Sequence, residues 1–323
     1  MDDRRQWDQD GYVVLRGASP ADAVAAYPHD IARLRDGLLV RTPGDEYASL
    51  AVRAEPDSAG AVDPYAISDV ARAVLLAEPV VSFLTGLFQA PPLLFDAVET
   101  TAGAPDSGLY RDATYVAVAE EPAALVGALV ALGDATLDLV PGSQVLATSP
   151  FSGRYRHYNA ERDGDAALTR HREELTAALA GHDRGAETVT LAPGDVVLWH
   201  AALVHGPPDG GPALYAHLCP TRAQPSWFAY RPERARHAEF GGAWLTTQHY
   251  DLVDAVADDP AADPEPVTGP QIEQIADALE AHDDRPPDAP SPPPPAPEVA
   301  HRRGGGGLLG SVRGLMGRRH RGR

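Results

Sequence analysis

Seven segments with the character of buried β-strands lie between residues 93 and 220 and constrain the fold more than any other feature. Most are unbroken apolar runs rather than polar and apolar alternations, which is typical of strands covered on both faces. They comprise residues 93–101, 114–119, 125–132, 137–140, 187–192, 195–206 and 213–220. A helical pattern at 165–181, with leucines at 168, 175 and 179, interrupts them.

Helical patterns precede these strands. Residues 10–17 read as one short strand closed by a glycine, and residues 19–36 as a helix that Ser19 caps. Residues 67–88 read as two helices, with Ser68 capping the first and Pro79 in the first turn of the second. Helices followed by a run of strands predict an α+β protein built on a β-sandwich or jelly roll.

Composition excludes several classes of protein. The net charge of −19 argues against nucleic-acid binding by the folded part. Cys219 is the single cysteine, so an internal disulfide framework and a cysteine-based zinc site are excluded, and we expect it to be a small core residue. The first ten residues are mostly polar and lack the apolar stretch of a secretion signal, so we expect a cytoplasmic protein.

The chain changes character after about residue 250. Residues 251–300 are acidic and proline-rich, which predicts a linker, and 271–282 have the pattern of one short helix. Residues 301–323 hold seven arginines and no acidic residue, which predicts a disordered basic tail. Its apolar residues between the arginines favour contact with an anionic membrane surface or an acidic protein. The predicted organisation is a domain at 1–250, this linker and this tail.

The candidate chemistry lies in two of the predicted strands. His200 and His205 are five residues apart, so a continuous strand would point them to opposite faces. Asp112 stands at the predicted start of an earlier strand. A carboxylate there and a histidine on a later antiparallel strand have the layout of a 2-His-1-carboxylate site for non-haem iron. The plain alternative for either histidine is a hydrogen-bonded core residue.

At this point the sequence resembles the phytanoyl-CoA dioxygenase family of Fe(II)/2-oxoglutarate oxygenases. The resemblance rests on pieces in the family's order over roughly residues 8–230: DGYVVLRG, YRDATYV, LVGALVALGD, VPGSQ, PFSGRYRHYN, LAPGDVVLWHAALVHG and ALYAHLCP. It implies a double-stranded β-helix, or cupin-like, core that binds Fe(II) and 2-oxoglutarate. Asp112 matches the family's carboxylate ligand, and His205 matches its distal histidine.

The sequence departs from the family at three positions. Tyr110 stands where the family has its first histidine ligand, and Gln144 replaces the histidine of the PGSH turn. The arginine that pairs with 2-oxoglutarate in the family would fall near Pro212, but no basic residue lies between His205 and His217. Tyr110 would ligate only as a phenolate, against an ordinary pKa of about 10. Without the arginine, the charge-assisted fork that orients the co-substrate is missing.

We interpret these losses together as the mark of a pseudoenzyme that acts in ligand binding or regulation. The pocket candidates are Gln144, His157, Trp199 and His200. The alternative is an active dioxygenase that hydroxylates a small molecule, with iron held by Asp112, His205 and Tyr110. In a third hypothesis the folded part is a scaffold, and the linker and basic tail carry a tethering role.

Overall fold

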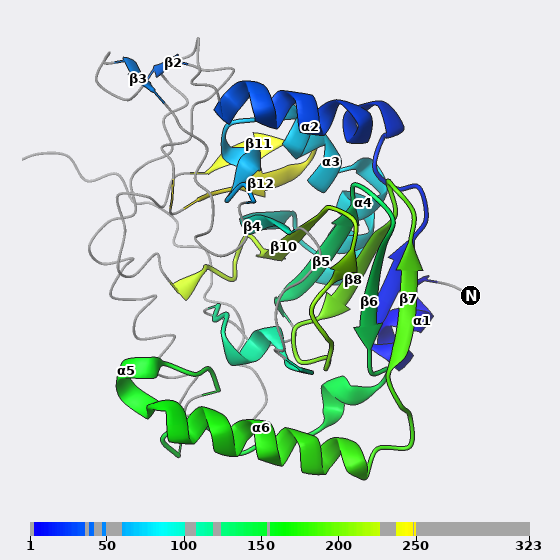
Figure 1. Cartoon of the computed structure of the whole chain (residues 1–323), viewed down its shortest axis with the longest axis vertical. Helices are drawn as coiled ribbons and strands as arrows, with labels where there is room; N and C mark the ends of the chain where they lie inside the picture. Colours follow the sequence, from blue (N-terminus) through cyan, green and yellow to red (C-terminus); the bar gives the residue numbers. More distant parts are fainter. Residues whose placement is uncertain are drawn as a thin grey trace, which may run out of the picture. The chain divides into compact units, whose positions relative to one another are not determined.

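The computed structural model describes residues 3–35, 39–41, 47–49, 60–100, 108–118, 124–153, 156–226, 237–247 and 249 (Figure 1). The predicted linker, its helix at 271–282 and the basic tail therefore lie outside the described residues. The described residues fall within one unit, Met1–Pro287.

Two β-sheets form the centre of this unit. The larger has seven strands in the order β1-β8-β5-β10-β4-β12-β11, and the smaller has three in the order β7-β6-β9. Neighbouring strands are antiparallel, except that β12 runs parallel to β4. The strands of the larger sheet are β1 (Tyr12–Leu15), β4 (Pro92–Thr100), β5 (Val126–Ala131), β8 (Val196–His200), β10 (Ala213–Pro220), β11 (Ala238–Phe240) and β12 (Ala243–Leu245). Those of the smaller are β6 (Ala135–Leu139), β7 (Glu187–Leu191) and β9 (Asp209–Gly210).

The two faces of the larger sheet bury different sets of side chains, because successive residues of a strand point to opposite faces. Leu214, Ala216 and Leu218 of β10 belong to a core shared with the N-terminal helices. Ala213 and Tyr215 instead belong to a core that includes Leu137 and Leu139 of the smaller sheet. The larger sheet is therefore covered on both faces, and the space between the two sheets is the interior of the predicted double-stranded β-helix.

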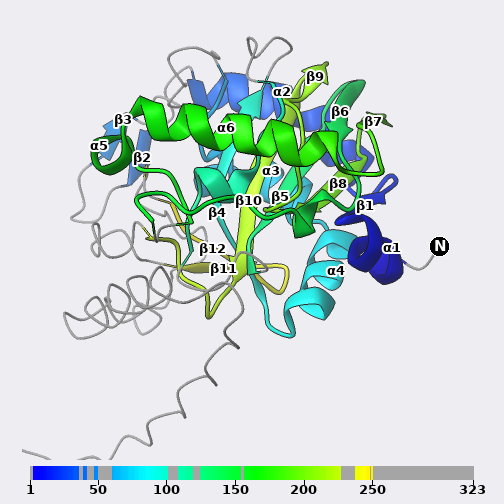
Figure 2. The same ribbon diagram turned by 90° about the horizontal axis from the view of Figure 1, so that it is seen from below.

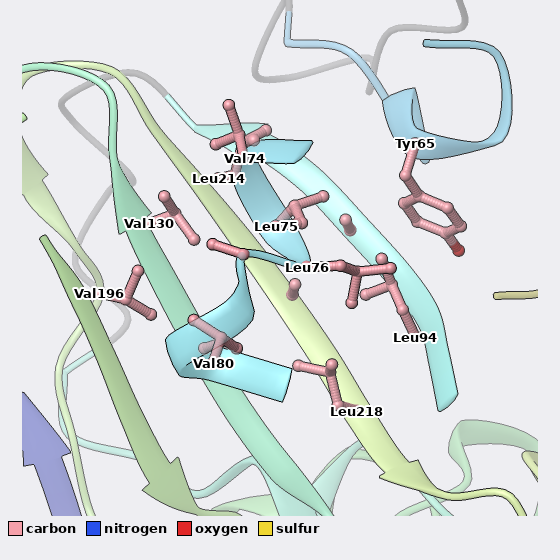
Figure 3. Packing of buried hydrophobic residues seen from close by; sticks show 14 of the residues in the cluster. Tyr65, Val74, Leu75, Leu76, Val80, Leu94, Val130, Val196, Leu214 and Leu218 are labelled. Atoms are coloured by element: carbon pink, nitrogen blue, oxygen red, sulfur yellow. The ribbon is translucent and has the colours of Figure 1, made fainter. Parts of the chain in front are cut away.

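The helical core is built by four N-terminal helices: α1 (Asp3–Asp10), α2 (Ala21–Arg35), α3 (Asp69–Leu75) and α4 (Glu78–Phe88). Figure 3 shows Leu75, Leu76 and Val80 lying over β4, β5 and β10. The Ser68 hydroxyl accepts a hydrogen bond from the Ala71 amide at the start of α3, as predicted, and Pro79 lies in the first turn of α4.

The sequence predicts that Ser19 caps the helix that follows it, α2. Its hydroxyl instead donates to the carbonyl oxygen of Val74, so it ties the start of α2 to α3. Within the described ranges no single helix is long and apolar enough to span a membrane. The pair α3 and α4, bent by 56°, reaches that length and composition only together.

The long helix α6 (Asp165–Ala180) is seen from the side in Figure 2 and follows the short α5 (Ala160–Asp163). Leu175 of α6 packs on Val140 and Val204, and His171 contacts Thr114 through Nε2 and Oγ1, 3.1 Å apart. Helix α6 thereby covers the segments that carry Asp112 and His205. The remaining elements are the hairpin β2 (Leu39–Arg41) and β3 (Tyr47–Ser49), and the 3-10 turns η1 (Pro64–Ala66), η2 (Asp112–Thr114) and η4 (Ser143–Val145).

Two predicted strands are wrong in part. Asp112 does not begin a strand but begins η2, and Tyr110 and Val118 make isolated bridges on either side of it. The predicted strand 195–206 ends at His200 and is followed by a turn, after which His205 pairs with Tyr110 and Leu139 as isolated bridges. Because Asp112 and His205 lie outside regular strands, the alternation of strand residues does not determine where their side chains point.

Asp195 fixes the corner where β8 begins. Its carboxylate accepts hydrogen bonds from the amides of Gly17 and Ala192 and from the Arg16 guanidinium, at 2.7 to 3.0 Å. Burial acts to raise the pKa of Asp195, but these hydrogen bonds and the charge of Arg16 outweigh it and hold the pKa below its usual value. The carboxylate therefore stabilises the fold while it is ionised.

This corner predicts a pH dependence of stability. Because the folded-state pKa is lowered, the contribution of Asp195 is complete above the usual carboxyl pKa of ~4 and is lost as the pH falls through the folded-state value. The free energy of unfolding of Asp195→Asn should therefore fall less than that of the wild type between pH 5 and pH ~2 in urea titrations. The exposed Asp183→Asn serves as the control, and equal acid dependence in all three proteins would contradict the assignment.

Candidate functional site

The carboxylate of Asp112 lies inside the barrel at the centre of the candidate site. Its side chain is 2% exposed, and both oxygens have partners. Nε1 of Trp199 donates to Oδ2 over 2.7 Å, and the hydroxyl of Tyr215 donates to Oδ1. Nε2 of His205 lies 3.1 Å from the same Oδ1. Asp112 and His205, which the sequence predicted as iron ligands, are therefore in direct contact.

A glycine makes this arrangement sterically feasible. Gly127, the second residue of β5, stands directly behind the Trp199 ring and the Asp112 carboxylate. A Cβ atom on residue 127 would lie 2.3 Å from Cε2 of Trp199 and 2.5 Å from Oδ2 of Asp112. Both distances are far inside van der Waals contact, so the hydrogen bond between the indole and the carboxylate requires glycine here.

Tyr110 lies beside the site without bonding to the Asp112 carboxylate. Its amide donates to the His205 carbonyl over 2.8 Å, and the His205 amide donates back over 2.9 Å. The two rings are 4.4 Å apart between centroids. Burial, followed by the charge of Asp112, raises the pKa of the Tyr110 phenol. The phenol therefore stays protonated at neutral pH and is a poor metal ligand.

Tyr215 and His217 on β10 complete the cluster, and neither was predicted from the sequence. They alternate with Leu214, Ala216 and Leu218, so they face the barrel interior. Nδ1 of His217 lies 2.9 Å from Oδ2 of Asp96 on β4, and its Nε2 lies 3.7 Å from Oδ1 of Asp112. The pairing of β10 with β4 shifts register between His217 and Leu218, right beside Asp96.

The charges in the cluster compensate one another. Burial acts to raise the pKa of Asp112, but the charges and hydrogen bonds of His205 and His217 outweigh it and hold the pKa well below its usual range. Burial acts to lower the pKa of His217, but its contacts with Asp112 and Asp96 raise it to about 10. His217 is therefore an imidazolium between two carboxylates at neutral pH.

The pocket candidates divide between the barrel and its outside. Trp199 is fully buried in the barrel and bonds Asp112. His200 points the other way, as strand alternation requires, and its ring lies 6.4 Å from that of Trp7 on α1. Burial, helped by the charge of Arg111, lowers the pKa of His200 to about 4. His200 is thus a neutral residue on the opposite side of the strand from the Asp112 cluster.

Gln144 and His157 lie on loops. Oε1 of Gln144 is buried without a hydrogen-bond partner among the described residues, and it packs against Gly11. Arg111 turns away from Asp112, and its guanidinium donates to the carbonyls of Ser143 and Leu146, which hold this loop in place. His157 precedes α5, where its carbonyl accepts a hydrogen bond from Arg162. The described contacts of these two candidates do not bring them to the Asp112 carboxylate.

A tight turn replaces the segment where the family has its co-substrate arginine. The Gly211 amide donates to the Asp134 carbonyl over 2.6 Å, and the Pro212 carbonyl accepts from Leu132 and Gly133. A Cβ atom on Gly211 would lie 2.8 Å from the Asp134 carbonyl oxygen. The backbone here therefore leaves no room for a side chain at 211. Arg222, which follows β10, donates to the Phe88 carbonyl at the end of α4.

The residues present do not fit the iron and 2-oxoglutarate that the family implies. Tyr110 offers a protonated phenol where a histidine is needed. Among the described residues, no three His, Cys, Asp or Glu side chains form a group able to hold a metal ion. Within the described ranges no guanidinium is placed at the turn before β10, where Gly211 and Pro212 pack against the backbone. The arrangement is a hydrogen-bonded polar cluster enclosed by aromatic rings.

The cluster predicts a structural role for Asp112 in metal-free protein. Asp112→Asn removes the charge that His217 faces and presents an amide to donors, so it should lower the free energy of unfolding by about 3 kcal/mol. Urea unfolding in the presence of a chelator measures this value. Asp138→Asn, the same change at an exposed β6 carboxylate, should stay within about 0.5 kcal/mol of wild type. Similar stabilities for the two variants would show that the cluster contributes little.

Comparisons with known proteins place the chain in a family. The sequence model of the family described as phytanoyl-CoA dioxygenase matches residues 7–208. No curated protein sequence matches the chain.

Several solved structures are similar at low identity. One is EctD from S. alaskensis with bound Fe, with a TM-score of 0.48 and 19% identity over 68% of this chain and 77% of that chain. Another is the non-heme alpha ketoglutarate dependent carbocyclase SnoK from nogalamycin biosynthesis. Its TM-score is 0.46 and its identity 17%, over 69% of this chain and 84% of that chain. HygX from Streptomyces hygroscopicus with nickel and 2-oxoglutarate bound has a TM-score of 0.42 and 19% identity, over 68% of this chain and 86% of that chain.

These similarities are too low to transfer the ligands or reactions of those proteins to this chain. The family match is of a different kind, because it spans more than half of the chain and includes both Asp112 and His205. The chain therefore belongs to the phytanoyl-CoA dioxygenase family.

Proposed function

We propose that this chain is a pseudoenzyme of its family, which acts in ligand binding or regulation rather than in 2-oxoglutarate-dependent oxidation. The observation that carries the proposal is the state of the Asp112 carboxylate. Asp112 directs one oxygen to an indole N–H and the other to a phenol O–H and an imidazole, so side chains of the protein surround the carboxylate where the family places its ion.

The turn before β10 supports the proposal independently. A 2-oxoglutarate oxygenase has to hold the distal carboxylate of its co-substrate, and a guanidinium does so through two parallel hydrogen bonds. Here that position is a Gly-Pro turn packed against the backbone of Gly133 and Asp134. The two losses affect different partners, the metal and the co-substrate, so a single compensating substitution does not restore both.

The ligand we propose is a small molecule, received where the family receives its substrate. The contacts of the basic tail with an anionic membrane surface or an acidic protein, and the cytoplasmic location, stay predictions from the sequence.

Anaerobic titration of metal-free protein with Fe(II), with and without 2-oxoglutarate, tests the proposal. We expect no binding below millimolar iron and no metal-to-ligand absorption band when both are added, because Tyr110 replaces one of the two histidine ligands and the Gly-Pro turn replaces the arginine. Succinate release is expected to stay at the level of a no-protein control. A tight iron site with the absorption band would overturn the proposal.

The second candidate is an active dioxygenase with an altered site, and one observation favours it. Asp112 and His205, the two ligands that the chain keeps, are brought within 3.1 Å of each other in the barrel. Under this alternative, wild-type protein forms succinate from 2-oxoglutarate, and Asp112→Ala and His205→Ala each abolish it. Equal background rates in all three proteins would exclude the alternative.

A further inference from the structure

Arg111 is a buried positive charge that the barrel does not use. The residue is 6% exposed, and burial lowers its pKa to about 10, so it stays charged at neutral pH. Its Nη2 donates to the Ser143 and Leu146 carbonyls, whereas its Nε is buried without a hydrogen-bond partner among the described residues. None of the described carboxylates pairs with it. Carbonyl oxygens satisfy N–H groups but do not neutralise a charge, so the guanidinium lacks a counter-ion.

His171 of α6 offers a second buried group without a partner. The residue is 7% exposed, and its ring packs against that of Phe151 with centroids 4.8 Å apart. Its Nε2 lies 3.1 Å from the Thr114 hydroxyl oxygen, whereas its Nδ1 is buried without a hydrogen-bond partner in the described part of the chain. When the Thr114 hydroxyl donates to Nε2, the neutral ring carries its proton on Nδ1 and presents an unused N–H donor.

The short turn η2 brings these two groups together. Arg111 directly precedes η2, Thr114 ends it, and the Thr114 amide donates to the Arg111 carbonyl over 3.1 Å. The contact of Thr114 with His171 therefore places the imidazole of α6 beside the turn that begins at Arg111. Burial, followed by the charge of Arg111, lowers the pKa of His171. The pair thus carries the single positive charge of the guanidinium and two unused donors.

The acidic residue of α6 nearest to His171 on its inner side serves a different purpose. Glu174 lies one turn further along the helix, and its Oε2 accepts a hydrogen bond from the Ser149 amide over 2.9 Å. Its charge acts to raise the pKa of His171, but burial and Arg111 outweigh it. Glu174 therefore ties α6 to the loop before Phe151 and does not form an ion pair with the guanidinium.

We propose that Arg111 and His171 form a binding site for a small free oxyanion, such as phosphate or sulfate, between η2 and α6. The oxyanion accepts hydrogen bonds from Nε of Arg111 and Nδ1 of His171 and supplies the missing negative charge. The inference is independent of the proposed function, because the Asp112 carboxylate and its partners in the barrel take no part in it. Since Arg111 directly precedes Asp112, a bound anion also holds the start of the turn that carries this carboxylate.

The test is isothermal titration calorimetry of the full-length chain with sodium phosphate near neutral pH, with sodium chloride holding the ionic strength constant. We expect a site that takes up one equivalent of phosphate and that sulfate competes for, because both ions offer the same tetrahedral set of acceptor oxygens. Absence of phosphate binding by the wild-type protein overturns the inference. Failure of sulfate to compete overturns its assignment to oxyanions as a class.

Two variants locate the site. His171→Phe keeps a ring against Phe151 but removes Nδ1, and we expect it to bind phosphate about tenfold more weakly, as the loss of a hydrogen bond to a charged group predicts. Arg111→Met should abolish binding, and circular dichroism checks that both variants are folded. If Arg111→Met does not fold, His171→Phe decides the test alone.

Matched substitutions outside the site serve as controls. Arg172→Met, at an exposed position of α6, and His182→Phe, beyond the end of that helix, should bind phosphate as the wild type does. Unchanged binding in His171→Phe would assign the phosphate to other arginines of the chain and overturns the inference. An equal loss in the control variants overturns the assignment of residues, and each of these results leaves the proposed function standing.

Discussion

The ionised carboxylate of Asp112, buried inside the barrel, is the constraint on which the rest of the site depends. A charge in a low-dielectric interior is tolerated only when hydrogen bonds and an opposite charge surround it. The chain meets this requirement from several directions, with Trp199 from β8, His205 from the segment after it, and Tyr215 and His217 from β10. The double-stranded β-helix brings these segments to one point, because its two sheets enclose a common interior.

In the family to which the chain belongs, the equivalent carboxylate is expected to serve a metal ion. Here the protein itself supplies what the ion would supply. Positive charge comes from the His217 imidazolium, whose pKa is raised by Asp112 and Asp96, and hydrogen-bond donation comes from an indole and a phenol. Under the proposed function, the barrel keeps its buried acidic residue and its architecture without the cofactor. This separation of fold from chemistry explains how the family match and the altered site coexist.

Much of the fold follows from the sequence, because caps and apolar runs act locally. Ser68 and Pro79 mark the starts of α3 and α4, and β4, β5 and β10 match their apolar segments within one or two residues. The site was predictable only where the resemblance supplied it, as for Asp112 and His205. Tyr215 and His217 share one face of a strand, but β10 is buried on both sides, so alternation did not reveal which face was the interior. The turn at Asp112 was missed because its apolar neighbours read as a strand.

Gly127 has a consequence for the order in which such a chain can change its sequence. The volume that it leaves free is occupied by the Trp199 ring and one oxygen of Asp112, so the three positions share a single space. A side chain at 127 is tolerated only after residue 199 has become smaller, and a smaller residue there takes the indole donor away from Asp112. Each substitution toward a roomier barrel thus passes through an intermediate whose buried charge lacks a hydrogen-bond donor. Such intermediates are less stable than the present protein, so a change of the barrel interior lowers stability before it can yield a new activity.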